Sequence, residues 1–111
     1  MCSSDLSKNA MGESRVTMLR TAAPPFSNDA EFFPGMDKRW GLTFMINNEK
    51  APTGRSPGSL AWAGLANTYY WIDQKKGVGG VYATQVLPFA DPRVVKLYGQ
   101  FEGAVYESLK A

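Results

Sequence analysis

The sequence predicts an α+β domain in which an antiparallel sheet of about four strands carries one C-terminal helix. Three observations lead to this fold class. Apolar and polar residues alternate in segments of strand length through the middle of the chain. The turns between the later segments have hairpin length, which joins antiparallel neighbours. After Asp91 the apolar spacing changes to the period of a helix, and strands followed by a helix are typical of the α+β class.

Four segments are expected to form the strands, because each has strand length and is bounded by turn residues. They are residues 40–47, 59–62, 68–73 and 78–87. In the first segment, the core face is expected to hold Trp40, Leu42, Phe44 and Ile46. Residues 74–77 form the turn before the last segment, where Gly77 is free to adopt positive φ. The pair Gly79 and Gly80 predicts a bulge or a close backbone neighbour in that strand.

The C-terminal helix is expected to begin at Asp91 and Pro92. Aspartate is a favoured N-cap, and proline is favoured at the first helical position. Apolar residues then recur at helical spacing and predict the buried face: Val94, Leu97, Phe101, Ala104, Val105 and Leu109. The polar residues are expected to point elsewhere: Lys96, Gln100, Glu102 and Glu107. Burial of the apolar face would dock the helix on the sheet, at roughly 1.5–3 kcal/mol per large side chain.

Composition excludes several classes of function. The chain has 111 residues, of which 44% are hydrophobic, so one folded domain is expected. A net charge of +2 with scattered basic residues does not indicate a nucleic-acid partner, and no apolar run is long enough to span a membrane. The absence of histidine removes the commonest general base, the Ser-His-Asp triad and most transition-metal sites. No metal or organic cofactor is implied.

The segment Gly58–Asp73 is unusual because it is aromatic and almost uncharged. It holds two of the three tryptophans and two of the five tyrosines, and it contains no lysine, arginine or glutamate. A hairpin on the surface normally carries charge on its outer face. We therefore expect this hairpin to be covered or to line a cleft. Tyr69, Tyr70 and Trp71 are interpreted as packing residues rather than as a platform for ligands.

These residues also carry a resemblance to a known family. Gly-Ser-Leu-Ala-Trp-Ala-Gly-Leu-Ala-Asn at 58–67, then Thr-Tyr-Tyr-Trp-Ile-Asp, Gly-Val-Gly-Gly-Val-Tyr and a final helix, resembles the C-terminal end of the β-lactamase-related serine hydrolases. This family includes class C β-lactamases, penicillin-binding proteins and esterases, and the esterases are most similar. The resemblance covers residues 7–111 and implies part of a β-lactamase/transpeptidase-like fold.

The resemblance implies a site at the end of the predicted strand 59–62. In the family, Ser-x-x-Lys supplies the nucleophile, Tyr-x-Asn or Tyr-x-Ser handles a proton, and Lys-Thr-Gly lines the opposite wall. Here Trp62, Ala63 and Gly64 stand in place of Lys-Thr-Gly and would form the substrate-binding wall. The backbone N–H of Leu65 would be one of two oxyanion-hole donors. Asn67 is interpreted either as a turn former, since asparagine tolerates the left-handed region, or as a substrate contact.

Physical chemistry agrees with this placement. Acyl transfer places negative charge on the carbonyl oxygen, and one fixed backbone donor is worth roughly 10²–10³ in rate. Gly64 lets a substrate approach the backbone closely. Trp62 and Ala63 lack the charge and hydroxyl group that would hold a substrate carboxylate. The wall therefore favours a neutral ester or acyl chain over a β-lactam.

The nucleophile of the family is absent from this sequence. No serine is followed three residues later by lysine. Tyr106-Glu107-Ser108 matches Tyr-x-Ser, but it lies on the predicted final helix. Lys75-Lys76-Gly77 resembles Lys-Thr-Gly, but it is interpreted as a turn.

We therefore expect residues 7–111 to be the C-terminal part of a serine hydrolase that forms an acyl-enzyme on an ester or amide substrate. The missing N-terminal part of the same domain would supply the serine, and the 111-residue chain alone would be inactive. Residues 1–6 resemble a translated sequencing adapter and are expected to be a non-native leader; an ordinary polar N-terminus is the other interpretation. The alternative function is a small, non-catalytic α+β binding module that uses the aromatic hairpin as a contact surface.

Overall fold

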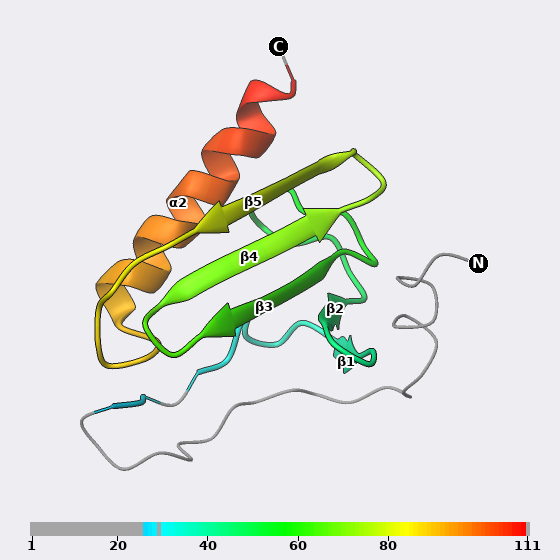
Figure 1. Cartoon of the computed structure of the whole chain (residues 1–111). Coiled ribbons are helices and arrows are strands. Elements are labelled where there is room, and N and C mark those ends of the chain that lie inside the picture. The colour runs from blue at the N-terminus through cyan, green and yellow to red at the C-terminus, as the bar shows by residue number, and fades with distance from the viewer. Residues whose placement is uncertain (1–25, 29, 111) are drawn as a thin grey trace.

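The computed structural model describes residues 26–28 and 30–110, and it has the predicted α+β architecture (Figure 1). Five strands form one antiparallel sheet in the order β1-β2-β3-β4-β5, and helix α2 lies along one face of it. The strands are β1 (Lys38–Trp40), β2 (Met45–Asn47), β3 (Leu60–Gly64), β4 (Thr68–Asp73) and β5 (Val78–Tyr82), and α2 is Pro92–Ser108. The expected leader, residues 1–6, lies outside the described residues. No helix in the described ranges is long and apolar enough to cross a membrane.

The prediction of one strand over 40–47 is wrong, because this segment belongs to a tight hairpin. Strand β1 ends at Trp40, strand β2 begins at Met45, and these two residues are paired in the sheet. Between them, Gly41 N donates a hydrogen bond to Phe44 O at 2.9 Å. Leu42 was expected in the core but is 66% exposed at the turn. The apolar–polar alternation continues unbroken through the turn, so the pattern does not reveal the reversal.

The central hairpin follows the prediction closely. Strand β4 has the expected bounds, and β3 runs two residues beyond the expected end, to Gly64. The connection closes through a hydrogen bond from Asn67 N to Gly64 O at 3.1 Å, with Asn67 at φ 58°. A three-residue hairpin loop that ends in a left-handed residue has this form. The second turn, 74–77, also forms as predicted, with Gly77 at φ 66°.

Strand β5 is shorter than the predicted 78–87. It ends at Tyr82, which pairs with Tyr69 near the start of β4. Beyond this pair β4 offers almost no further backbone partner, so the chain leaves the sheet. Thr84 Oγ1 then donates to Ala66 O at 2.6 Å, which anchors the departing segment to the β3–β4 turn. The prediction of strand for residues 83–87 is therefore wrong.

The paired glycines of β5 make room for an indole ring. The register of β4 against β5 is regular across Gly79 and Gly80, so the strand contains no bulge there. A Cβ atom on Gly80 would overlap the ring of Trp71, and one on Gly79 would lie 2.9 Å from Trp71 O. The prediction of a close neighbour at this pair is therefore confirmed.

Helix α2 begins as predicted but turns a different face toward the sheet. Asp91 Oδ1 accepts hydrogen bonds from Arg93 N at 2.9 Å and from Val94 N at 3.2 Å, which confirms the N-cap. The buried residues of the helix are Tyr98, Glu102 and Tyr106. The predicted face is wrong in part, since Leu97, Phe101 and Leu109 are exposed. The prediction that Glu102 points elsewhere is wrong, and the apolar spacing did not include Tyr98 or Tyr106 in the buried face.

The core lies between α2 and one face of the sheet. Tyr69 of β4 stacks on Tyr98 of α2 with ring centroids 4.8 Å apart, and the Trp71 ring lies 6.3 Å from that of Tyr106. Tyr69 and Trp71 are each 1% exposed and therefore serve as packing residues, as predicted. Successive residues of a strand point to opposite faces, so Ile72 and the 67% exposed Val81 lie on the other face. No described helix covers that face.

Adding a methyl group at Gly80 tests the contact with Trp71. Gly80→Ala should destabilise the protein by about 1–3 kcal/mol, because a buried indole has to shift. The matched control is Gly103→Ala, which adds a methyl group to α2 where no atom lies within 4 Å. That variant should gain about 0.5–1 kcal/mol from improved helix propensity. Urea unfolding measures both, and equal stability of Gly80→Ala and wild type would contradict the packing described.

Candidate functional site

The last half of β3 presents an unpaired backbone edge. Strand β2 pairs with β3 only at Leu60 and Ala61. Trp62, Ala63 and Gly64 pair with β4 on one side, and in the described part of the chain no strand pairs with them on the other. An edge of this kind offers free N–H and C=O groups to whatever binds along it. The predicted substrate-binding wall thus coincides with an open sheet edge.

The backbone N–H of Leu65 is free and points away from the hairpin. Gly64 O accepts a hydrogen bond from Asn67 N inside the turn. In a planar trans peptide the N–H points opposite to the C=O of the same unit. The Leu65 N–H therefore points toward the unpaired side of β3, and among the described residues it has no hydrogen-bond acceptor. Leu65 itself is 59% exposed.

The wall beside this donor is aromatic and uncharged. The Trp62 ring lies 4.3 Å from the Trp40 ring, at an interplanar angle of 71°, and 6.2 Å from the Phe32 ring. Trp40 packs at the end of β1, which agrees with its interpretation as a packing residue. At Gly64 an added Cβ would meet nothing closer than Thr68 Cβ at 3.7 Å. Packing within the described residues therefore does not require glycine at this position.

The Asn67 side chain holds the β3–β4 turn in place through hydrogen bonds to the segment between β5 and α2. It is completely buried, and its Nδ2 donates to Val86 O at 2.8 Å and to Pro88 O at 2.7 Å. Its Oδ1 accepts from Tyr69 Oη at 2.7 Å and from Asp91 N at 3.1 Å. The two donors and two acceptor sites of the amide are all used. The interpretation as a left-handed turn former is confirmed, and no polar group of the side chain is free for a substrate.

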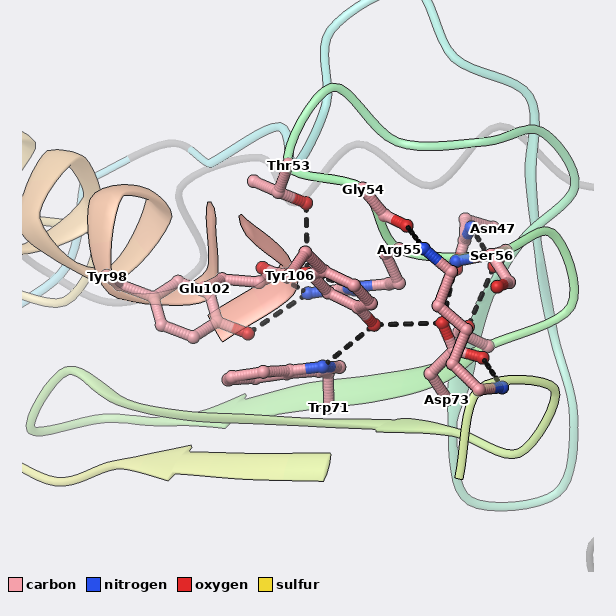
Figure 2. Close-up of polar contacts among 12 residues, drawn as sticks. Asn47, Thr53, Gly54, Arg55, Ser56, Trp71, Asp73, Tyr98, Glu102 and Tyr106 are labelled. Atoms are coloured by element: carbon pink, nitrogen blue, oxygen red, sulfur yellow. Dashed lines mark hydrogen bonds and ion pairs between the residues drawn. The ribbon is translucent and has the colours of Figure 1, made fainter. Parts of the chain in front are cut away.

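Sequence reasoning missed a buried ion pair between the loop before β3 and α2 (Figure 2). Arg55 Nε donates to Glu102 Oε1 at 2.6 Å, and Arg55 Nη2 donates to Glu102 Oε2 at 2.8 Å. Thr53 Oγ1 also donates to Oε1, and Tyr98 Oη accepts from Arg55 Nη2. Burial acts to lower the pKa of Arg55, but the hydrogen bond and charge of Glu102 outweigh it and raise the pKa. The guanidinium therefore stays charged.

A second buried network holds the far end of β4. Asp73 Oδ2 accepts from Ser56 N and from Tyr106 Oη, each at 2.9 Å, and Oδ1 accepts from Lys76 N at 3.0 Å. Trp71 Nε1 donates to Tyr106 Oη at 3.1 Å (Figure 2). Desolvation acts to raise the pKa of Asp73, but these hydrogen bonds outweigh it and lower the pKa. Burial raises the pKa of Tyr106, so this phenol is a fixed donor.

The structure also places the two motifs that were set aside. The phenol of Tyr106 is buried in the Asp73 network, and Ser108 Oγ donates to Val105 O within the helix. Lys75, Lys76 and Gly77 form the exposed turn after β4, as expected. No three His, Cys, Asp or Glu side chains of the described ranges are grouped to hold a metal ion.

Comparison with known proteins gives one informative similarity. No protein-family profile matches the chain, and no solved structure is significantly similar to it. The chain is 32% identical over 71 residues to a curated protein of Penicillium decumbens described as "Acyltransferase calJ". The aligned region covers 63% of this chain and 17% of that protein, so the chain spans less than a fifth of its relative. The chain is thus similar to a segment of an acyl-transferring enzyme.

The Asp73 network predicts an acid-dependent loss of stability. The carboxyl has a lowered pKa in the folded state against an ordinary value of 3.8. Its contribution is therefore complete above the unfolded pKa and is lost as pH falls through the folded pKa. Between about pH 5 and pH 2, urea unfolding should show a steeper loss of stability for wild type than for Asp73→Asn. Glu49→Gln, at an exposed carboxylate, should keep the wild-type profile, and parallel profiles for Asp73→Asn and wild type would contradict the assignment.

Removing one partner of the Arg55–Glu102 pair should lower the free energy of unfolding far more than replacing both partners with apolar residues. Arg55→Met or Glu102→Leu alone leaves one buried charge without its partner, at a cost of about 3–5 kcal/mol. The double variant removes both charges and should recover most of this loss. A double-mutant cycle from urea unfolding measures the coupling. Additive losses, with no recovery in the double variant, would show that the pair does not act as a unit.

Proposed function

We propose that this chain is the C-terminal part of a β-lactamase-related serine enzyme that transfers or hydrolyses acyl groups. The observation that carries the proposal is the free Leu65 N–H at an open strand edge, beside an uncharged aromatic wall. A fixed donor of this kind stabilises the oxyanion of acyl transfer without reorganisation. The similarity to an acyltransferase supports the same class of chemistry.

In the proposed mechanism, a serine outside this chain attacks an ester or amide carbonyl. A basic partner takes the proton of the serine, and the carbonyl oxygen gains negative charge in the tetrahedral intermediate. The Leu65 N–H and the N–H of the serine itself donate hydrogen bonds to this oxygen. The bond to the leaving group then breaks, the leaving group takes a proton, and an acyl-enzyme remains. Water releases the acyl group in a hydrolase, and an acceptor alcohol or amine takes it in an acyltransferase.

The wall residues set the class of substrate. Trp62, which packs against Trp40 and Phe32, offers an apolar surface where related enzymes carry lysine. Ala63 and Gly64 leave the adjoining backbone accessible and supply no charge. A neutral ester or acyl chain therefore fits this wall better than a substrate that presents a carboxylate.

The remaining part of the enzyme would pack on the uncovered face of the sheet. Ile72 and Val81 expose apolar surface on that face. No helix of the described residues covers it. Exposed apolar patches of soluble proteins commonly mark contact surfaces. The missing N-terminal part of the same domain, which would carry Ser-x-x-Lys, is the proposed occupant. The short aligned share of the curated relative agrees with this division.

The alternative, a binding module that uses the aromatic hairpin as its contact surface, receives less support. Tyr69 and Trp71 are buried under α2 and cannot contact a partner. Of the hairpin aromatics, only the half-buried Trp62 and Tyr70 remain for that role.

The proposal predicts that the contiguous coding sequence upstream encodes Ser-x-x-Lys followed by Tyr-x-Asn or Tyr-x-Ser. In the enzyme expressed from it, Leu65→Pro should lower kcat/KM for a nitrophenyl ester by roughly 10²–10³, because the oxyanion donor is lost. Proline suits this position of the turn and breaks no hydrogen bond, so the protein should stay folded. The control Leu65→Ala keeps the N–H and should retain activity within about threefold.

Three outcomes would contradict the proposal. The first is a natural stop codon close upstream of Ser7. The second is ester hydrolysis by the 111-residue chain alone that a serine-directed inhibitor abolishes. The third is equal activity of Leu65→Pro and Leu65→Ala, which would remove Leu65 from the oxyanion hole.

A further inference from the structure

A cavity of about 410 Å³ lies between α2 and the sheet, bordered by residues 31–36 and by the loop before β3. It is on the helix-bearing face, since Tyr69 of β4 and Tyr98 of α2 both line it. Trp62 is shared with the substrate wall, but Ala63, Gly64 and Leu65 do not line the cavity. The cavity thus adjoins the proposed acyl-transfer edge at Trp62, and the rest of its lining lies outside that edge.

Most of the lining is apolar and includes soft side chains. The apolar groups come from three parts of the chain: Phe32 and Met36 from the first loop, Met45 and Trp62 from the sheet, and Val95 from α2. Small-molecule sites are commonly concave and apolar, with a few polar groups that orient the ligand. A volume of this size falls within the range of such sites.

Two hydrogen-bond donors at this cavity have no acceptor. Tyr98 Oη accepts from Arg55 Nη2, so its own hydrogen remains available. The hydrogen bonds of Arg55 use Nε and Nη2, and none uses Nη1. Neither residue has a further hydrogen-bond partner among the described residues, and the Arg55 guanidinium also lies over the Phe33 ring, 5.0 Å from its centroid. Both side chains are more than nine-tenths buried, and both residues line the cavity. A ligand oxygen in the cavity would accept hydrogen bonds from these two donors.

The charges around the cavity disfavour an anion. Glu102 balances Arg55 through two hydrogen bonds, and Glu31 adds a second carboxylate at the exposed border of the cavity. The lining therefore carries no unbalanced positive charge. Burial raises the pKa of Tyr98, so its hydroxyl stays protonated and acts as a donor at neutral pH. A neutral acceptor is thus the complement of this site.

We propose that this cavity binds a neutral, largely apolar small molecule that presents a carbonyl oxygen to Tyr98 and Arg55. The carbonyl of a ketone, ester or amide accepts both free donors without bringing a charge into the cavity. The aromatic and methionine side chains then enclose the apolar remainder of the ligand. This binding is independent of acyl transfer and needs only the residues described.

Gly99 gives the means to close the cavity. It lies on α2, lines the cavity, and has no atom within 4 Å of the position that a Cβ would occupy. A larger side chain there enters the empty volume without a backbone clash. Gly103, one turn further along α2, has equally open space but does not line the cavity. The two glycines form a matched pair, because leucine improves helix propensity at both positions.

The test uses the 111-residue protein and 6-propionyl-2-dimethylaminonaphthalene, a neutral fluorescent ketone of naphthalene size. Its emission should shift to the blue and saturate on titration. Gly99→Leu should weaken binding more than tenfold, whereas Gly103→Leu should bind as wild type does. Tyr98→Phe should weaken binding about three- to tenfold through loss of one hydrogen bond. Thermal unfolding should show that both glycine variants remain folded.

The preference for a neutral ligand is tested by competition against the fluorescent ketone. The 2-naphthoate anion should need at least a tenfold higher concentration than neutral 2-acetylnaphthalene to displace half of the probe. Equal probe affinity of Gly99→Leu and wild type would show that the probe binds elsewhere, and would contradict the proposed site. Tighter binding of naphthoate would overturn its neutral character. These measurements follow binding and not turnover, so they would have the same outcome if the acyl-transfer proposal were wrong.

Discussion

The buried ion pair of Arg55 and Glu102 is the interaction on which the rest of the fold depends. It points Glu102 inward, so Tyr98 and Tyr106, one turn on either side, point inward as well. Tyr98 then stacks on Tyr69 of the sheet. Removing a charge from water is expensive, and the bidentate geometry offsets that cost only while both partners are present. The pair therefore couples the rotation of α2 to the position of the loop before β3.

That loop is held at a second point, which connects the helix to the strand edge. Ser56 follows Arg55 directly, and its N–H binds Asp73 at the end of β4. At the opposite end of β4, Asn67 ties the β3–β4 turn to Pro88 and to the cap residue of α2. Both ends of the hairpin are thus fixed by buried polar side chains. The orientation of the peptide N–H at Leu65 follows from this rigidity, as an oxyanion donor would require.

The two faces of the sheet have different roles in the proposals. One face packs on α2 and encloses an apolar cavity with two free donors, from Tyr98 and Arg55. The other face carries Ile72 and Val81 uncovered and is the proposed contact for the rest of the domain. Between the two faces, the edge at Trp62 to Gly64 stays open because β2 stops pairing at Ala61. A short β2 is thus the structural reason that the wall is accessible.

The sequence by itself determined the α+β class, the β3–β4 hairpin and the Asp91 cap, because each depends on patterns within a few residues, and it left Asn67 as either a turn former or a substrate contact. It also indicated the wall at Trp62 to Leu65 by resemblance, whereas the cavity and the donors of Arg55 had no sequence signal. Only the tertiary structure decided which face of α2 is buried and where the first hairpin reverses. The deciding partner of Glu102 lies 47 residues away, and local periodicity carries no information about contacts at that separation.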